Sequence, residues 1–272
     1  MPDASPLACR TSGDSGPRVV FLHGLFGQGK NWHTIGLRLA ERGYRVTTVD
    51  LPNHGQSPWS PTQDYGEMAQ RVAELLDGLG DPVTLVGHSM GGKVAMTLAL
   101  RRPELLHALV VVDIAPVDYR TEGSDSQFAG YIKGMQEIDP SSLRSRGDAD
   151  KALAEAVPDA GIRSFLLQSL MREADDGWRW RLNLDVLQRD LGSLGGFPDP
   201  PPGAVYQGPV LWIAGAESNY IQQDSRQRMT ELFPHTRLVR IKGAGHWVHS
   251  EQPQVFLAAV SAFLDEVGVS QA

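Results

Sequence analysis

Residues 87–91 read Gly-His-Ser-Met-Gly and directly follow the short apolar run 83–86. A serine becomes an exposed nucleophile when a sharp turn from a strand into a helix lifts its hydroxyl above the edge of a sheet. Such a turn strains the backbone at the serine and leaves no room for side chains two residues to either side, which glycine satisfies at 87 and 91. A helical pattern over 92–100, ending before Pro103, supplies the second half of the turn. The segment therefore predicts Ser89 as a nucleophile.

A serine hydroxyl needs a base within hydrogen-bond reach, and imidazole has the pKa suited to that role. Of the eight histidines, His246 is the best placed, because it lies in a glycine-rich loop after the last predicted strand and follows Ser89 in the chain. His249 lies three residues further on and is easily confused with His246. A His-x-x-His pair also resembles part of a metal site, but no complete ligand set is evident, so we predict no metal.

The third member of such a site is a carboxylate that fixes the imidazole tautomer, and two positions compete for it. Asp113 directly ends the predicted strand 109–112, whereas Glu217 follows the predicted strand 210–213. The acid often follows the later strand as Gly-x-x-Asp, but residues 215–218 read Gly-Ala-Glu-Ser, which places Ser218 at that position. We favour Asp113 and keep Glu217 as the alternative acid. Asp50 also ends a strand, and we expect it to brace the loop 51–57.

Acyl transfer further requires two N–H donors for the developing oxyanion. Residues 23–27 read His-Gly-Leu-Phe-Gly and follow the predicted strand 19–22, so their backbone can approach the nucleophile closely. We predict the backbone N–H groups of Leu25 and Met90 as the oxyanion hole, with Phe26 as the alternative to Leu25. Neither Gly-x-Gly-x-x-Gly nor Gly-Lys-Ser/Thr occurs, so we expect no cofactor.

The elements that position these residues alternate along the chain, which predicts an α/β fold with a mostly parallel sheet flanked by helices. The predicted strands are 19–22, 46–49, 83–86, 109–112, 210–213 and 238–241, and the predicted helices of this core are 32–42, 65–79, 92–100, 225–232 and 253–267.

The alternation stops between residues 117 and 207, where helical patterns over 150–157 and 162–172 precede a proline-rich return at 198–202. We predict a helical cap insertion over 117–207 and an α/β core made of 1–116 and 208–272. The cap aromatics are expected mainly to pack, with lining of an acyl pocket as the alternative; they are Phe128, Tyr131, Phe165, Trp178 and Trp180.

Composition excludes several classes of protein. The 272 residues carry a formal net charge of -7 without a basic block, which argues against nucleic-acid binding. The longest apolar strand is far too short for a membrane span, and the first residues hold no apolar targeting segment. Cys9 is the single cysteine, so no intramolecular disulfide forms. We expect a cytoplasmic protein.

The constellation resembles the α/β-hydrolase superfamily over nearly the whole chain, from His23 to His246. Three segments, Gly-His-Ser-Met-Gly-Gly-Lys at 87–93, Asp-Ile-Ala-Pro-Val-Asp-Tyr at 113–119 and Gly-Ala-Gly-His-Trp-Val-His at 243–249, resemble the small cofactor-free carboxylesterases of the YbfF type. In that subgroup the acid follows the earlier strand, so the resemblance carries its catalytic residues onto Ser89, Asp113 and His246. It implies hydrolysis of small-molecule esters with short acyl chains, and thioesters form a second class.

Other functions found on this fold are alternatives to ester hydrolysis. Haloalkane dehalogenation and epoxide opening use an aspartate nucleophile, which Ser89 excludes. Thioesterases, carbon–carbon bond hydrolases and perhydrolases share the same triad. A non-catalytic small-molecule-binding protein on this fold is the rival from another class, and the intact Ser89, Asp113 and His246 argue against it.

Overall fold

The computed structural model describes residues 5–120, 126–173 and 177–268. Its centre is a seven-stranded sheet in the order β1-β3-β2-β4-β5-β8-β9. The strands are β1 (Cys9–Ser12), β2 (Arg18–Leu22), β3 (Arg45–Val49), β4 (Val83–His88), β5 (Leu106–Val112), β8 (Val210–Gly215) and β9 (Thr236–Ile241). All neighbouring pairs are parallel except β1 with β3. The predicted α/β fold with a mostly parallel sheet is confirmed, and each of the six predicted strands lies within an observed one.

Helices cover both faces of the sheet because alternate strand residues point to opposite sides. In β2, Val19 and Phe21 pack in one apolar cluster, whereas Val20 and Leu22 pack in the other. The first face carries α1 (His33–Ala40), α9 (Val248–Glu251) and α10 (Pro253–Glu266). The second carries α2 (Tyr65–Asp77), α3 (Met90–Arg101) and α8 (Ser225–Leu232). The 3-10 turn Gly29–Trp32 places Trp32 in the cluster of the first face, and the 3-10 turn Pro103–Leu105 packs Leu105 against the cluster of the second.

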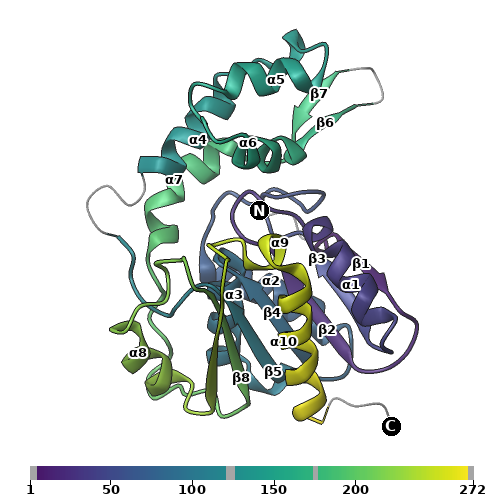
Figure 1. Ribbon diagram of the computed structural model, residues 1–272, viewed down its shortest axis with the longest axis vertical. Coiled ribbons are helices and arrows are strands. Elements are labelled where there is room, and N and C mark those ends of the chain that lie inside the picture. The colour runs from purple at the N-terminus through teal and green to yellow at the C-terminus, as the bar shows by residue number, and fades with distance from the viewer. Residues whose placement is uncertain (1–4, 121–125, 174–176, 269–272) are drawn as a thin grey trace.

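A second layer lies beyond one end of the sheet (Figure 1). It contains α4 (Ser126–Gln136), α5 (Arg146–Leu153), α6 (Ala160–Leu166) and α7 (Leu184–Gly195), with 3-10 turns at Pro140–Ser142 and Leu167–Ser169. A short antiparallel pair, β6 (Leu170–Arg172) and β7 (Trp178–Trp180), belongs to the same layer. Helix α7 runs from this layer back toward the sheet (Figure 1).

Two helices of this layer differ from their predicted bounds. The helix predicted over 162–172 ends at Leu166, and residues 170–172 form β6 instead, because their backbone pairs with β7. The helix predicted over 150–157 begins at Arg146 and ends at Leu153. Its start is fixed by a capping box, in which the Ser145 side chain accepts from the Asp148 N–H and the Asp148 side chain accepts from the Ser145 N–H.

The edge strand β1 was not predicted, because its residues are polar and mostly exposed and so carry no apolar alternation. Its order comes from backbone pairing with β3, in which Cys9 lies opposite Val49. Among the helices of the described ranges, none is long and apolar enough to cross a membrane.

Candidate active site

The nucleophile turn joins β4 directly to α3. Ser89 has φ 51° and ψ -116°, a left-handed conformation that costs free energy for a residue with a side chain. A Cβ atom on Gly87 would lie 2.2 Å from the Gly91 carbonyl oxygen, and one on Gly91 would lie 2.5 Å from the His23 carbonyl oxygen. Both glycines are therefore required by close backbone approach, and the strained turn predicted at Ser89 is present.

A continuous chain of hydrogen bonds links the three predicted residues. Ser89 Oγ lies 3.0 Å from His246 Nε2, and His246 Nδ1 lies 2.8 Å from Asp113 Oδ2. Because a carboxylate only accepts, the Nδ1 proton of His246 is donated to Asp113, which leaves Nε2 free to accept from the Ser89 hydroxyl. Asp113 is fully buried and the His246 side chain is 15% exposed, so this chain is largely shielded from water.

The carboxylate of Asp113 is fixed on both oxygens. Its Oδ1 accepts from the Gly215 N–H at 3.0 Å, and its Oδ2 accepts from the Ser218 hydroxyl as well as from His246. Asp113 has φ 52°, so its backbone too is held in the left-handed region. The structure thus places Asp113 against His246, whereas Glu217 is exposed and contributes its backbone N–H to the Ala244 carbonyl.

Ser218 was missed as a functional residue although its position was noted. It occupies the place after β8 where the acid often lies, and its hydroxyl donates to Asp113, which follows β5. The sequence signal was a hydroxyl at the fourth position of the stretch 215–218.

The loop after β2 approaches the nucleophile closely. A Cβ atom on Gly24 would lie 3.3 Å from Ser89 Cβ, so only glycine leaves this space open. The Phe26 N–H is donated to His54 Nε2 at 3.3 Å, so this geometry favours Leu25 over Phe26 as the donor. Within the described residues the Leu25 N–H has no acceptor, and Met90 opens α3, where the first N–H groups have no helical partner.

Two buried histidines brace this loop. His23 Nε2 accepts from the Leu51 N–H at 2.9 Å and its Nδ1 donates to the Gly24 carbonyl at 2.8 Å. His54 Nδ1 donates to the Pro52 carbonyl at 2.9 Å. Burial lowers the pKa of His23 to about 4 and the pKa of His54 to about 3, so both rings are neutral at pH 7.

Asp50 holds the neighbouring loop, as predicted. Its Oδ1 accepts from the Gly29 N–H at 2.6 Å and its Oδ2 from the Gln56 N–H at 2.8 Å. The predicted bracing role of Asp50 is therefore confirmed.

His249, three residues after His246, lies in a different environment. The His249 ring stacks on Trp32 with ring centroids 4.1 Å apart. Burial is the larger cause that lowers the pKa of His249 to about 3, and the nearby His246 is the smaller one. The hydrogen bond to Ser89 is made by His246, so the geometry does not favour His249 as the base. Within the described ranges no group of three His, Cys, Asp or Glu side chains could hold a metal ion.

Aromatic rings hold the His246 imidazole in place. Tyr220 stacks on it with centroids 4.1 Å apart and planes 27° apart, and Trp247 meets it edge-on. On the far side, His88 Nε2 donates to the His246 carbonyl at 2.9 Å, and burial keeps the pKa of His88 well below its usual range. The contacts with Tyr220 and His88 were not predicted, because they join segments distant in sequence.

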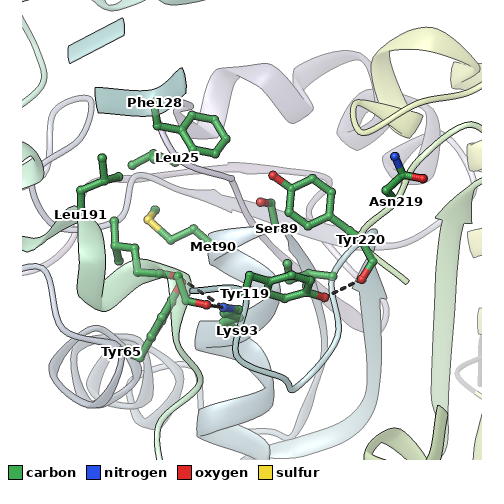
Figure 2. Close-up of a pocket in the computed structure, with 13 residues that line it drawn as sticks. Leu25, Tyr65, Ser89, Met90, Lys93, Tyr119, Phe128, Leu191, Asn219 and Tyr220 are labelled. Atoms are coloured by element: carbon green, nitrogen blue, oxygen red, sulfur yellow. Dashed lines mark hydrogen bonds between the residues drawn. The ribbon is translucent and has the colours of Figure 1, made fainter. Parts of the chain in front are cut away.

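A cavity of about 270 Å³ opens beside Ser89 (Figure 2). Its apolar lining comes from Leu25, Met90, Ile114, Phe128, Leu191 and Leu194, and its polar lining from Tyr65, Lys93, Tyr119, Asn219 and Tyr220. A smaller cleft of about 20 Å³ also contacts Ser89, and its lining includes His246, Phe128, Tyr131 and Phe165. Phe128, Tyr131 and Phe165 thus line space next to Ser89, which agrees with the alternative expectation for them, whereas Trp178 and Trp180 line neither space.

Comparison with known proteins places the chain in a family. A model described as the alpha/beta hydrolase family matches residues 19–259. The mouse (Mus musculus) sn-1-specific diacylglycerol lipase ABHD11 is 44% identical over 254 residues, which span 91% of this chain and 81% of that protein. Esterase YbfF of Escherichia coli is 34% identical over 249 residues, spanning 91% of this chain and 93% of the other.

A solved structure described as a marine microorganism esterase superposes with a TM-score of 0.91 at 33% identity, covering 95% of this chain and 99% of that one. The chain belongs to the alpha/beta hydrolase family.

Proposed function

We propose that this protein is a serine carboxylesterase in which Ser89 is the nucleophile, His246 the general base and Asp113 the acid that orients the histidine. The observation that carries the proposal is the unbroken chain from Ser89 Oγ through His246 to Asp113 at the mouth of an apolar cavity. Relatives named as an esterase and as a lipase support ester hydrolysis.

In the first half-reaction, the Ser89 oxygen attacks the ester carbonyl carbon while His246 Nε2 takes the hydroxyl proton. The carbonyl electrons move onto its oxygen, which the N–H groups of Leu25 and Met90 stabilise as the oxyanion hole. Collapse of this intermediate breaks the bond to the alkoxy oxygen, and His246 returns the proton to the leaving alcohol. The acyl group stays on Ser89.

In the second half-reaction, His246 removes a proton from water, and the resulting oxygen attacks the acyl carbon. Collapse returns the proton to Ser89 and releases the carboxylic acid. Asp113 keeps the Nδ1 proton in place throughout and stabilises the imidazolium that forms in each step.

We assign the acyl chain to the larger cavity, because its lining is mostly apolar and the cleft on the other side of Ser89 holds only about 20 Å³. The substrate class is carboxylic esters with short acyl chains. The mouse relative is named for diacylglycerol, so glycerol esters are the first natural substrates to test.

We also propose residues 117–207 as a cap over the core formed by 1–116 and 208–272. A cytoplasmic location stays a prediction.

The test is hydrolysis of p-nitrophenyl esters from acetate to palmitate, together with a diacylglycerol and an acyl thioester, by the wild type and by Ser89→Ala. We expect turnover by the wild type and its loss in Ser89→Ala by several orders of magnitude. The chain-length optimum reports the depth of the cavity.

A fluorophosphonate that labels Ser89 provides an independent measurement. If Ser89 is labelled and the protein hydrolyses the thioester but no oxygen ester, the protein is a thioesterase and not a carboxylesterase. The absence of both labelling and turnover would favour a small-molecule-binding protein on the same fold.

A further inference from the structure

A lysine is buried one helical turn after the nucleophile. Lys93 is only 2% exposed, and in the described part of the chain no other lysine or arginine is buried to this degree. Its backbone N–H donates to the Ser89 carbonyl at 3.0 Å, so the lysine and the serine share the first turn of α3. Burying an ammonium group is costly unless its three donors are satisfied.

The end of α7 satisfies those donors. Lys93 Nζ donates to the carbonyl oxygens of Leu194 at 3.3 Å, Gly195 at 2.8 Å and Gly196 at 2.6 Å. The last carbonyls of a helix lack helical partners and carry the negative end of its dipole, so an ammonium is a favourable cap there. Lys93 belongs to the core. It therefore binds the C-terminal end of α7, the helix through which the chain returns from the cap layer.

The outgoing leg of the cap meets the same point. The Tyr119 N–H donates to the Gly195 carbonyl at 2.9 Å, and the ammonium lies 4.8 Å from the centre of the Tyr119 ring. Tyr65 of α2 donates its hydroxyl to the Leu194 carbonyl at 2.8 Å, and its ring centre lies 5.6 Å from the ammonium. Figure 2 shows Lys93 between these two tyrosines. Both connections between cap and core therefore converge on one buried cation.

The anchored segment also forms a wall of the cavity. Leu191, Leu194 and Gly195 of α7 line the space beside Ser89, as Lys93 and Tyr119 do. A shift of the end of α7 would change the width of the cavity without touching the hydrogen bonds among Ser89, His246 and Asp113.

We propose that Lys93 is a positioning residue: its ammonium fastens both legs of the cap to the nucleophile helix and so sets the distance of the α7 wall from Ser89. The kinetic part of the test rests on the proposed esterase function. The structural part does not.

The first experiment compares hydrogen exchange of the wild type, Lys93→Met and Lys133→Met. Methionine keeps the length and apolar stem of lysine but removes the ammonium. Lys133 is an exposed cap residue paired with Glu137, so its variant is the matched control. We expect amides over 190–196 to exchange at least about tenfold faster in Lys93→Met, with β4 and β5 unchanged, and no change in Lys133→Met. Unchanged protection of 190–196 in Lys93→Met would overturn the proposal.

The second experiment separates positioning from chemistry. In Lys93→Met we expect KM for esters with longer acyl chains to rise about tenfold, while the rate of fluorophosphonate labelling of Ser89 stays within about threefold of the wild type. An equal loss across all chain lengths and in labelling would contradict the assignment, because it would place Lys93 in the chemical step. An inactive wild type would refute the esterase and leave the exchange result valid.

If Lys93→Met does not fold, Lys93→Gln retains two donors and gives a milder test. The wild type alone provides a further test of the proposal. Amides near the end of α7 should exchange as slowly as those of the core, and exchange as fast as that of the cap loops would overturn the proposal.

Discussion

The Ser218 hydroxyl donates to the same oxygen of Asp113 that accepts the His246 proton. Ser218 follows β8 and Asp113 directly follows β5, and these two strands are neighbours in the sheet. The carboxylate on the earlier strand therefore carries the negative charge, and the residue at the later position supplies a hydrogen-bond donor to it. Each oxygen of the buried carboxylate thus receives at least one donor, which lowers the cost of keeping the charge buried.

Removing the Ser218 hydroxyl should reduce activity without abolishing it, because Asp113 would lose one of its hydrogen-bond donors. We expect Ser218→Ala to lower kcat roughly tenfold with KM nearly unchanged, since a hydrogen bond to a charged group contributes about 1.5 kcal/mol. Ser218→Thr keeps a hydroxyl and should recover much of the loss. Steady-state kinetics on a p-nitrophenyl ester checks both, and wild-type kcat in Ser218→Ala would contradict the supporting role.

The two candidate acids predict opposite results. We expect Asp113→Asn to lower kcat by roughly 10³- to 10⁴-fold, because an amide no longer fixes the reactive tautomer of His246. Glu217→Gln should stay near the wild type, because Glu217 is exposed and Asp113 holds the histidine. The reverse pattern would assign the acid to Glu217.

Gly91, two residues after Ser89, is predicted to tolerate no side chain. In Gly91→Ala the new methyl group would meet the His23 carbonyl oxygen at 2.5 Å, so we expect a loss of stability of about 3 kcal/mol or more. The matched control is Gly130→Ala in α4, where a Cβ atom meets nothing within 4 Å and should raise stability by up to about 1 kcal/mol. Urea unfolding measures both, and equal effects of the two changes would be inconsistent with the close approach.

Stability should fall in mild acid because His23 and His54 are buried as neutral rings. Folding lowers the pKa of His23 from 6.5 to about 4 and that of His54 from 6.5 to about 3. The unfolded chain thus binds more protons than the folded one below pH 6.5, so stability is complete above that pH and is lost as the pH falls toward about 4. We expect a loss of about 2 kcal/mol for each ring at pH 5, measured by urea unfolding between pH 5 and 7.

Two variants locate the source of that pH dependence. His54→Gln should reduce the slope of stability against pH, whereas His235→Gln, at an exposed position, should leave it unchanged. A wild type equally stable at pH 5 and pH 7 would refute the assignment.

The assignment of the acyl chain to the larger cavity can be tested at its wall. Leu191→Trp should fill part of that space, so we expect kcat/KM to fall at least about tenfold for octanoate and longer esters and to change little for acetate. An equal decrease for all chain lengths would instead place the alcohol group in this cavity.

The sequence by itself determined the nucleophile turn, the order of the six parallel strands along the chain and the loops that follow them. These features depend on contacts between near neighbours, such as the clash that a side chain at Gly87 would make with the Gly91 carbonyl. The helix positions of the core follow from the same local periodicity, which is why α2, α3 and α10 lie where they were predicted.

Tertiary structure decided which carboxylate meets the histidine. Asp113 and Glu217 both follow strands, and only the arrangement of β5, β8 and the loop after β9 brings Asp113 Oδ2 to His246, a residue 133 positions away. The engagement of Phe26 by His54, the hydroxyl of Ser218 on Asp113 and the capping of α7 by Lys93 likewise join segments distant in sequence. Such contacts leave no local pattern, because the free energy of a buried hydrogen bond depends on which partner the packed chain places within reach.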